Sequence, residues 1–151
     1  MAGVLPDDHA RSDGALVGVG VEAVAHQPVE FRVLGPLEIA VGGKLVSAGG
    51  TKQRALLTRL LLDAGRTVST ERLVDDLWGD EPPGTARKMI QVYVSRLRKL
   101  LPAGASLQTR PPGYQLTLPP DSLDLDRFER LRVSGRLALE QGRYEEAARE
   151  L

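Results

Sequence analysis

Cysteine is absent from this chain of 151 residues, and aromatic side chains make up only 4 % of it. Without cysteine the chain has no disulfide, no thiolate zinc site and no thiol nucleophile. With so few aromatics, a hydrophobic core has to consist of leucine, valine and alanine, although hydrophobic residues are plentiful at 42 %. The composition predicts a globular protein and fits a reducing compartment.

Long hydrophobic runs and catalytic motifs are also lacking. The longest apolar run near the N-terminus, residues 15–21, is about a third of a membrane span and precedes no signal-cleavage site. His9 and His26 have no candidate catalytic partner, and no nucleophile elbow, phosphate loop or zinc-protease motif occurs. We therefore expect a cytoplasmic protein without enzymatic activity, cofactor, metal or membrane contact.

Acidic side chains are missing from one segment. Twenty basic and 20 acidic residues cancel over the whole chain, but residues 84–110 contain six basic residues and no acidic one. The six are Arg87, Lys88, Arg96, Arg98, Lys99 and Arg110. A local excess of positive charge is typical of a surface that binds phosphates. The distribution, and not the total, indicates a nucleic acid as partner.

Turn residues divide the front of the chain into short elements. Residues 1–29 show no sustained hydrophobic period and are expected to be a poorly ordered extension. The apolar runs that follow, with Gly42 and Gly43 as a two-residue hairpin turn, predict a small antiparallel sheet. Its expected strands occupy residues 31–35, 37–41 and 44–47.

Three helices are expected next, over residues 51–63, 70–78 and 85–101. In the first, leucines recur on one face. Ser69 or Thr70 can cap the second, in which Trp78 is expected to fill the core, and Thr85 can cap the third. Residues 79–84, with the sequence GDEPPG, cannot continue a helix because proline lacks the N–H donor. They are expected to form an exposed acidic loop.

The rest of the chain divides into a predicted β-hairpin and a predicted helical segment. Residues 107–110 and 114–118 flank a Pro-Pro-Gly tip and predict a projecting β-hairpin, or wing. Residues 123–141 and 143–151 resemble a helical pair of the tetratricopeptide kind, which cannot bury its apolar face alone, so this end is expected to belong to something longer. The predicted fold is α+β: a winged helix-turn-helix at residues 30–118, with an N-terminal antiparallel sheet, three helices and the wing, followed at residues 121–151 by an all-α segment.

The third helix has an apolar back and a cationic front. At about 100° per residue, the apolar positions face the core, and Lys88, Val92, Ser95, Arg96 and Lys99 lie on the opposite side, with Arg87 and Arg98 on one flank. Such a helix suits the major groove, where arginine bonds guanine and a small apolar side chain meets the thymine methyl group. Flanking cations would contact phosphates.

A basic helix face is, by itself, more often a solvated surface. The wing that follows favours DNA, because Arg110 at its tip would lie beside the next minor groove. Tyr93 borders the core. It can either pack in the core or contact the partner of this helix, and packing is favoured. The alternative function is a protein-interaction module whose basic face binds an acidic partner without specific DNA binding.

Five blocks of the sequence resemble a known family. They are FRVLGPLE at 31–38, KQRALL at 52–57, VSTERLVDDLWG at 68–79, VSRLRKLL at 94–101 and TRPPGY at 109–114. In this order they resemble the Streptomyces antibiotic regulatory proteins over residues 30–151. The resemblance implies an OmpR-type winged helix followed by the beginning of a bacterial transcriptional activator domain.

The resemblance also implies roles and partners. It makes the helix from Thr85 the recognition helix, with Arg96 at a base, Arg98 at a phosphate and Arg110 at the minor groove. The loop that contains Asp80, Glu81, Pro82 and Pro83 would contact RNA polymerase and its sigma factor. It further implies a nucleoid-associated homodimer on direct repeats of double-stranded promoter DNA, activating an antibiotic or other secondary-metabolite gene cluster.

Overall fold

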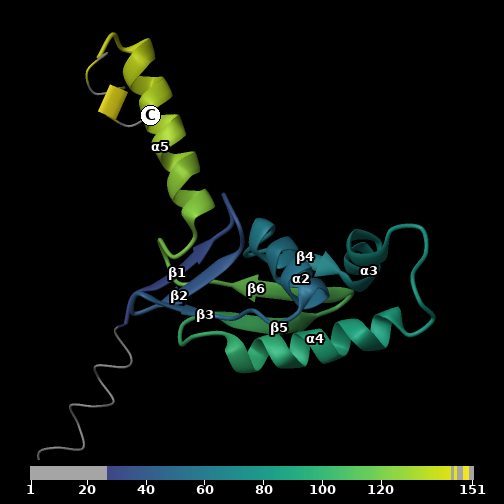
Figure 1. Cartoon of the computed structure of the whole chain (residues 1–151). Coiled ribbons are helices and arrows are strands. Elements are labelled where there is room, and N and C mark those ends of the chain that lie inside the picture. The colour runs from purple at the N-terminus through teal and green to yellow at the C-terminus, as the bar shows by residue number, and fades with distance from the viewer. Residues whose placement is uncertain (1–26, 144, 146–147, 150–151) are drawn as a thin grey trace, which may run out of the picture.

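A computed structural model describes residues 27–143, 145 and 148–149. These residues form two three-stranded antiparallel sheets, three helices packed with them, and one helix that stands away from the body (Figure 1). The predicted winged-helix architecture is thus confirmed. The expected N-terminal extension lies almost wholly outside the described residues, as does most of the second helix expected at residues 143–151.

The first sheet contains β1 (Val29–Arg32), β2 (Glu38–Val41) and β3 (Lys44–Val46) in that order. Gly42 and Gly43 both have positive φ, as a two-residue hairpin requires. The strand β1 ends earlier than expected, at Arg32, because the backbone N–H groups of Val33 and Leu34 donate to the Asp124 carboxylate and not to a strand. The predicted sheet is confirmed with shorter strands, and β1 begins two residues before its expected start, so Val29 belongs to the sheet and not to the N-terminal extension.

The three helices are α2 (Thr51–Leu62), α3 (Thr70–Trp78) and α4 (Ala86–Leu100). Most of their leucines and Ile90 make the core with Phe31 and Ile39 of the first sheet, whereas Leu62 is exposed. Ser69 caps α3 by accepting a hydrogen bond from the Arg72 N–H at 3.1 Å. Thr85 occupies the N-cap position of α4 as expected, but its side chain makes no capping hydrogen bond, so that part of the expectation is wrong.

Trp78 is only half buried, so its expected role as a core filler is confirmed only in part. The Lys52 ammonium lies 5.4 Å from the centre of the indole ring and donates to the backbone oxygen of Leu77. A cation over an aromatic face, bonded to one of the last carbonyls of a helix, stabilises both. Lys52 of α2 therefore fixes the end of α3, where the acidic loop begins.

The second sheet contains β4 (Thr67–Ser69), β5 (Ser106–Arg110) and β6 (Gly113–Thr117), in the order β4-β6-β5. The expected wing hairpin is confirmed. The short strand β4 is its third member; residues 67–68 are expected to be extended from the sequence, but their pairing with β6 is not predicted by it. The β5–β6 turn is attached to the start of α3, because Thr70 N and Oγ1 donate to Pro112 O at 3.1 and 3.3 Å.

The helix α5 (Asp124–Glu140) begins against β1 and then leaves the body (Figure 1). Leu123 is buried beside Phe31, whose backbone N–H donates to Ser122 O at 2.6 Å. Farther along, large apolar side chains of α5 are exposed: Phe128, Leu131, Val133, Leu137 and Leu139. Among the described helices none is long and apolar enough to span a membrane.

Candidate nucleic-acid interface

The helix α4 divides into a buried and an exposed side, as its periodicity predicts. Ile90, Val94 and Leu97 are almost completely buried, whereas Leu101, expected in the core, is only partly so. All of the predicted contact residues on this helix are exposed: Arg87, Lys88, Val92, Ser95, Arg96, Arg98 and Lys99. The apolar side fixes the helix on the core, so the opposite side has a defined direction toward solvent.

Three cations on this exposed side, Lys88, Arg96 and Lys99, form what we call the cationic front. Within the described part of the chain, none of them has an ion pair or a hydrogen bond. Arg32 of the first sheet is different, because its guanidinium donates hydrogen bonds to the carboxylates of Glu30 and Glu38, which raise its pKa and offset its charge. The charge of the cationic front is thus available to an anionic partner.

A shallow apolar groove interrupts the cationic front. Met89, Val92 and Tyr93 line it, between the side chains of Lys88 and Arg96. Val92 is 44 % exposed, so its methyl groups are open to a partner that fits the groove. Tyr93 is half buried and packs against the core, which supports packing, the favoured alternative, although the residue also lines the groove.

The two arginines on the flank of α4 are already engaged by the protein. Arg87 forms an exposed ion pair with Glu71 of α3 at 2.9 Å. Arg98 donates from Nε to the backbone oxygen of Leu107 and from Nη2 to Thr109 Oγ1, both at 2.9 Å. Both acceptors of Arg98 belong to β5 of the wing. The sequence predicts a free phosphate-binding arginine here, and the structure attaches this one to the wing.

Arg110 lies on the wing beside its Pro-Pro-Gly tip and is exposed. Its Nη2 donates to Gln108 Oε1 at 2.9 Å, which aligns the guanidinium along the strand. Two residues that contact this wing were not predicted as site residues: Thr70 of α3, which donates to Pro112 O in its turn, and Thr109 of β5, which accepts from Arg98. Their only signal in the sequence is a hydroxyl beside the Pro-Pro-Gly turn and beside the α3 cap.

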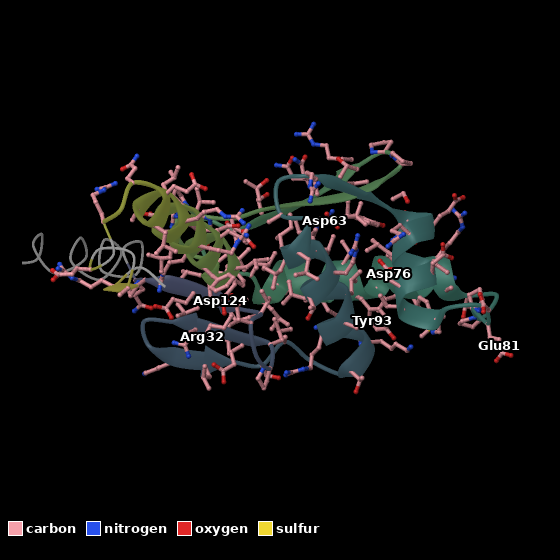
Figure 2. The ribbon with its side chains drawn as sticks, turned by 90° about the horizontal axis from the view of Figure 1, so that it is seen from above. Arg32, Asp63, Asp76, Glu81, Tyr93 and Asp124 are labelled. Carbon is pink, nitrogen blue, oxygen red and sulfur yellow. The ribbon has the colours of Figure 1, made fainter. Side chains whose placement is uncertain are left out.

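The acidic loop at residues 79–84 is exposed throughout, as expected. It connects α3 to the first turn of α4, so it lies next to the cationic front without belonging to it. Figure 2 shows Glu81 at the end of the molecule opposite α5. Gly79 has a φ of 62°, which lets the chain leave α3 sharply after Trp78.

This fold and this exposed helix define a winged helix-turn-helix of the OmpR type, the class found in DNA-binding transcription regulators. Residues 46–116 match the family described as "Transcriptional regulatory protein, C terminal". The sequence is 40 % identical over 135 residues to the transcriptional regulatory protein EmbR of Mycobacterium tuberculosis, and 36 % identical over 139 residues to the transcriptional regulator RedD of Streptomyces coelicolor. The chain thus contains an OmpR-type domain of transcriptional regulators and is homologous to regulators of the family of Streptomyces antibiotic regulatory proteins.

The matches to these relatives cover 85 % of this chain for EmbR and 81 % for RedD. The solved structure of EmbR, in complex with a low-affinity phosphopeptide, superimposes with a TM-score of 0.76 at 38 % identity over 82 % of this chain. The chain spans only about a third of the length of EmbR, 34 %. A match to the regulatory protein AfsR of Streptomyces griseus covers 76 % of this chain and 12 % of that protein.

Proposed function

We propose that this chain binds promoter DNA sequence-specifically and activates transcription, with α4 in the major groove and the wing beside the next minor groove. The unpartnered cationic front is the observation that supports this most strongly. A helix whose back is fixed on the core, with no acid along its length, meets phosphates without repulsion. Residues 30–118 form the DNA-binding domain in this proposal, and residues 121–151 begin the activator domain.

The residues of α4 divide by chemistry. Arg96 lies on the cationic front, and its guanidinium has no partner among the described residues, which suits a bidentate bond to guanine O6 and N7. Lys88 and Lys99 are point charges suited to phosphates, and Ser95 can bond either a base or a phosphate. The exposed ion pair of Arg87 with Glu71 is worth only about 0–1 kcal/mol, so a phosphate can replace the carboxylate.

A salt titration tests the DNA-binding proposal against the alternative of a protein-interaction module. The fluorescence anisotropy of a labelled duplex pool should report binding whose log affinity falls linearly with log salt. Each phosphate contact contributes about −0.9 to the slope. Selection of bound sequences should then enrich one motif. Binding of acidic proteins with no enrichment of any duplex would favour the alternative.

Val92 provides the first specific prediction. Its exposed methyl groups, in the apolar groove between two cations, match the 5-methyl group of thymine. In the selected duplex, replacing the contacted thymine by deoxyuridine removes only that methyl group and should weaken binding by about 1 kcal/mol. Val92→Ala should be nearly insensitive to the same replacement. Scanning deoxyuridine over every thymine without finding a sensitive position would contradict the assignment.

We further propose that the acidic loop contacts RNA polymerase and its sigma factor. Asp80 and Glu81 repel phosphates, yet the loop directly precedes the DNA-binding helix, so on DNA it would face a protein bound nearby. Pro82 and Pro83 stiffen it, which lowers the ordering cost of binding. In the full-length regulator, changing Asp80 and Glu81 to alanine should leave operator affinity unchanged or slightly raised.

Transcription from the target promoter should fall in that double variant, measured by run-off transcription beside the DNA affinity. Glu38→Ala, which removes an acidic side chain from the first sheet and not from the loop, is the matched control and should leave transcription unchanged. Full activation by the loop variant at normal DNA occupancy would make the loop a simple connector.

Direct repeats and dimerisation complete the proposal. The exposed apolar face of α5 supports a larger helical domain, tetratricopeptide-like in this proposal, in which two copies associate on DNA. Homology to regulators of this family supports a secondary-metabolite gene cluster as the target. A duplex with two tandem copies of the selected motif should bind two chains of the full-length regulator cooperatively, and a duplex with one copy should not.

A further inference from the structure

Arg98 is the one cation of the basic segment that the structure attaches to a different element by two side-chain hydrogen bonds. It projects from the last turn of α4, and Nε and Nη2 each contact an acceptor of β5 at 2.9 Å. One acceptor is a backbone oxygen, Leu107 O, and the other is a side-chain oxygen, Thr109 Oγ1. A guanidinium that bonds two acceptors in one strand fixes both the position and the direction of that strand.

The strand β5 needs such a contact. It lies at the edge of the second sheet, where β6 is its only neighbour in the ladder. The tip of the hairpin is attached to α3 through Thr70 and Pro112, but this bond fixes the turn and not the approach of β5 to α4. Leu107 is buried, so the base of β5 is anchored by its side chain, and Arg98 extends the anchoring two residues toward the tip.

The neighbouring Lys99, on the same turn of α4, differs from Arg98 in its contacts. It is exposed and, in the described residues, has no hydrogen bond or ion pair. Two adjacent cations thus differ in their surroundings: one already bonds the wing, and the other is open to a phosphate. Thr109, which accepts from Arg98, directly precedes Arg110, the cation of the wing.

We propose that Arg98 is a positioning residue that fixes the wing relative to α4, so that Arg110 and Arg96 meet the same duplex at once. This inference rests on the proposed DNA-binding function. It gives Arg98 a different task from the phosphate contact that the family resemblance implies. Its consequence is energetic coupling: the binding contribution of Arg110 depends on Arg98, whereas Lys99 contributes independently of the wing.

A double-mutant cycle in the 151-residue chain tests this coupling. Arg98→Ala should weaken binding of the selected duplex roughly fivefold to tenfold, the order of one lost charge-assisted contact. In the Arg110→Ala background, the same change should cost less than about twofold. Lys99→Ala, the matched control, should cost the same in both backgrounds and lower the salt slope by about one unit in each.

Two further variants separate geometry from charge. Arg98→Lys keeps the charge but loses the two-point contact, so it should resemble Arg98→Ala. Thr109→Val removes one acceptor and should reproduce part of the loss without any change of charge. Full affinity of Arg98→Lys, or an undiminished loss for Arg98→Ala in the Arg110→Ala background with a slope lower by about one, would overturn the proposal in favour of a phosphate contact.

Amide hydrogen exchange in the free protein tests whether Arg98 positions the wing in the absence of DNA. Its result therefore does not depend on the proposed function. Arg98→Ala should speed exchange of the β5 and β6 amides several-fold while those of α2 stay as in the parent protein. Lys99→Ala should change neither. Unchanged exchange in β5 and β6 would show that Arg98 does not position the wing, whether or not the chain binds DNA.

Discussion

Gly113→Ala is expected to destabilise the protein by about 3 kcal/mol or more, the upper end for an added methyl group in a packed site. A Cβ atom at this position would lie 1.8 Å from the backbone oxygen of Val68 and 2.7 Å from the Ser69 Cα. Both atoms belong to the backbone of β4, so no side-chain rotation can make room. The variant would have to separate β4 from β6 beside the tip of the wing.

Thermal unfolding followed by circular dichroism measures this effect, with an expected fall of roughly 10 °C in Tm for a domain of this size. Gly35→Ala is the matched control, because an added Cβ there meets no atom within 4 Å. It should stay within about 0.5 kcal/mol of the parent protein. Equal Tm values for the two variants would contradict the close strand contact that the structure places at Gly113.

The elements that the sequence predicted correctly depend on local patterns. The helix α4 was predicted because its apolar residues recur with the helical period, and burial of Ile90, Val94 and Leu97 follows from that recurrence alone. The wing was predicted because Pro-Pro-Gly between two short extended runs leaves few other conformations. The cationic front was likewise visible, since its residues share one side of a single helix. Direct contact of these residues with DNA stays a prediction.

The parts that were missed depend on contacts between distant residues. Asp124 accepts the N–H of Val33 across 91 positions in the chain, and this contact, not a turn residue, shortens β1. β4 pairs with β6 although the helices α3 and α4 separate them in sequence. Arg98 is 9 and 11 positions from its two acceptors. No periodicity encodes such pairings, because they are set by how whole elements pack.

The roles of Thr85 and Trp78 could likewise be predicted only in part. A threonine before a helix satisfies the capping pattern, and Thr85 does occupy the N-cap position of α4, but its side chain makes no capping hydrogen bond. Sequence patterns give the position of a cap but not the rotamer of its side chain. Trp78 ends α3 at the surface, where Lys52 covers its ring, so its side chain completes the edge of the core and also contacts a cation.

Arg96→Ala is expected to cost about 1–3 kcal/mol in binding to the selected duplex, which is about 5- to 150-fold in affinity. Arg96 is exposed on the cationic front, and among the described residues it has no partner that would have to be displaced. Binding to random duplex should change little in comparison, because that binding depends on phosphates. Anisotropy titrations on both duplexes at several salt concentrations measure the difference.

Two variants define what this loss means. Arg96→Lys retains the charge but not the planar fork that bonds guanine at two atoms, so most of the specific affinity should still be lost. Lys99→Ala should instead weaken the specific and the random duplex equally. Selection repeated with the Arg96→Ala protein should relax the preference at one base pair, since only the base that Arg96 contacts loses its partner. If Arg96→Ala weakens both duplexes to the same extent, Arg96 contacts a phosphate, and recognition of guanine has to come from another residue of α4.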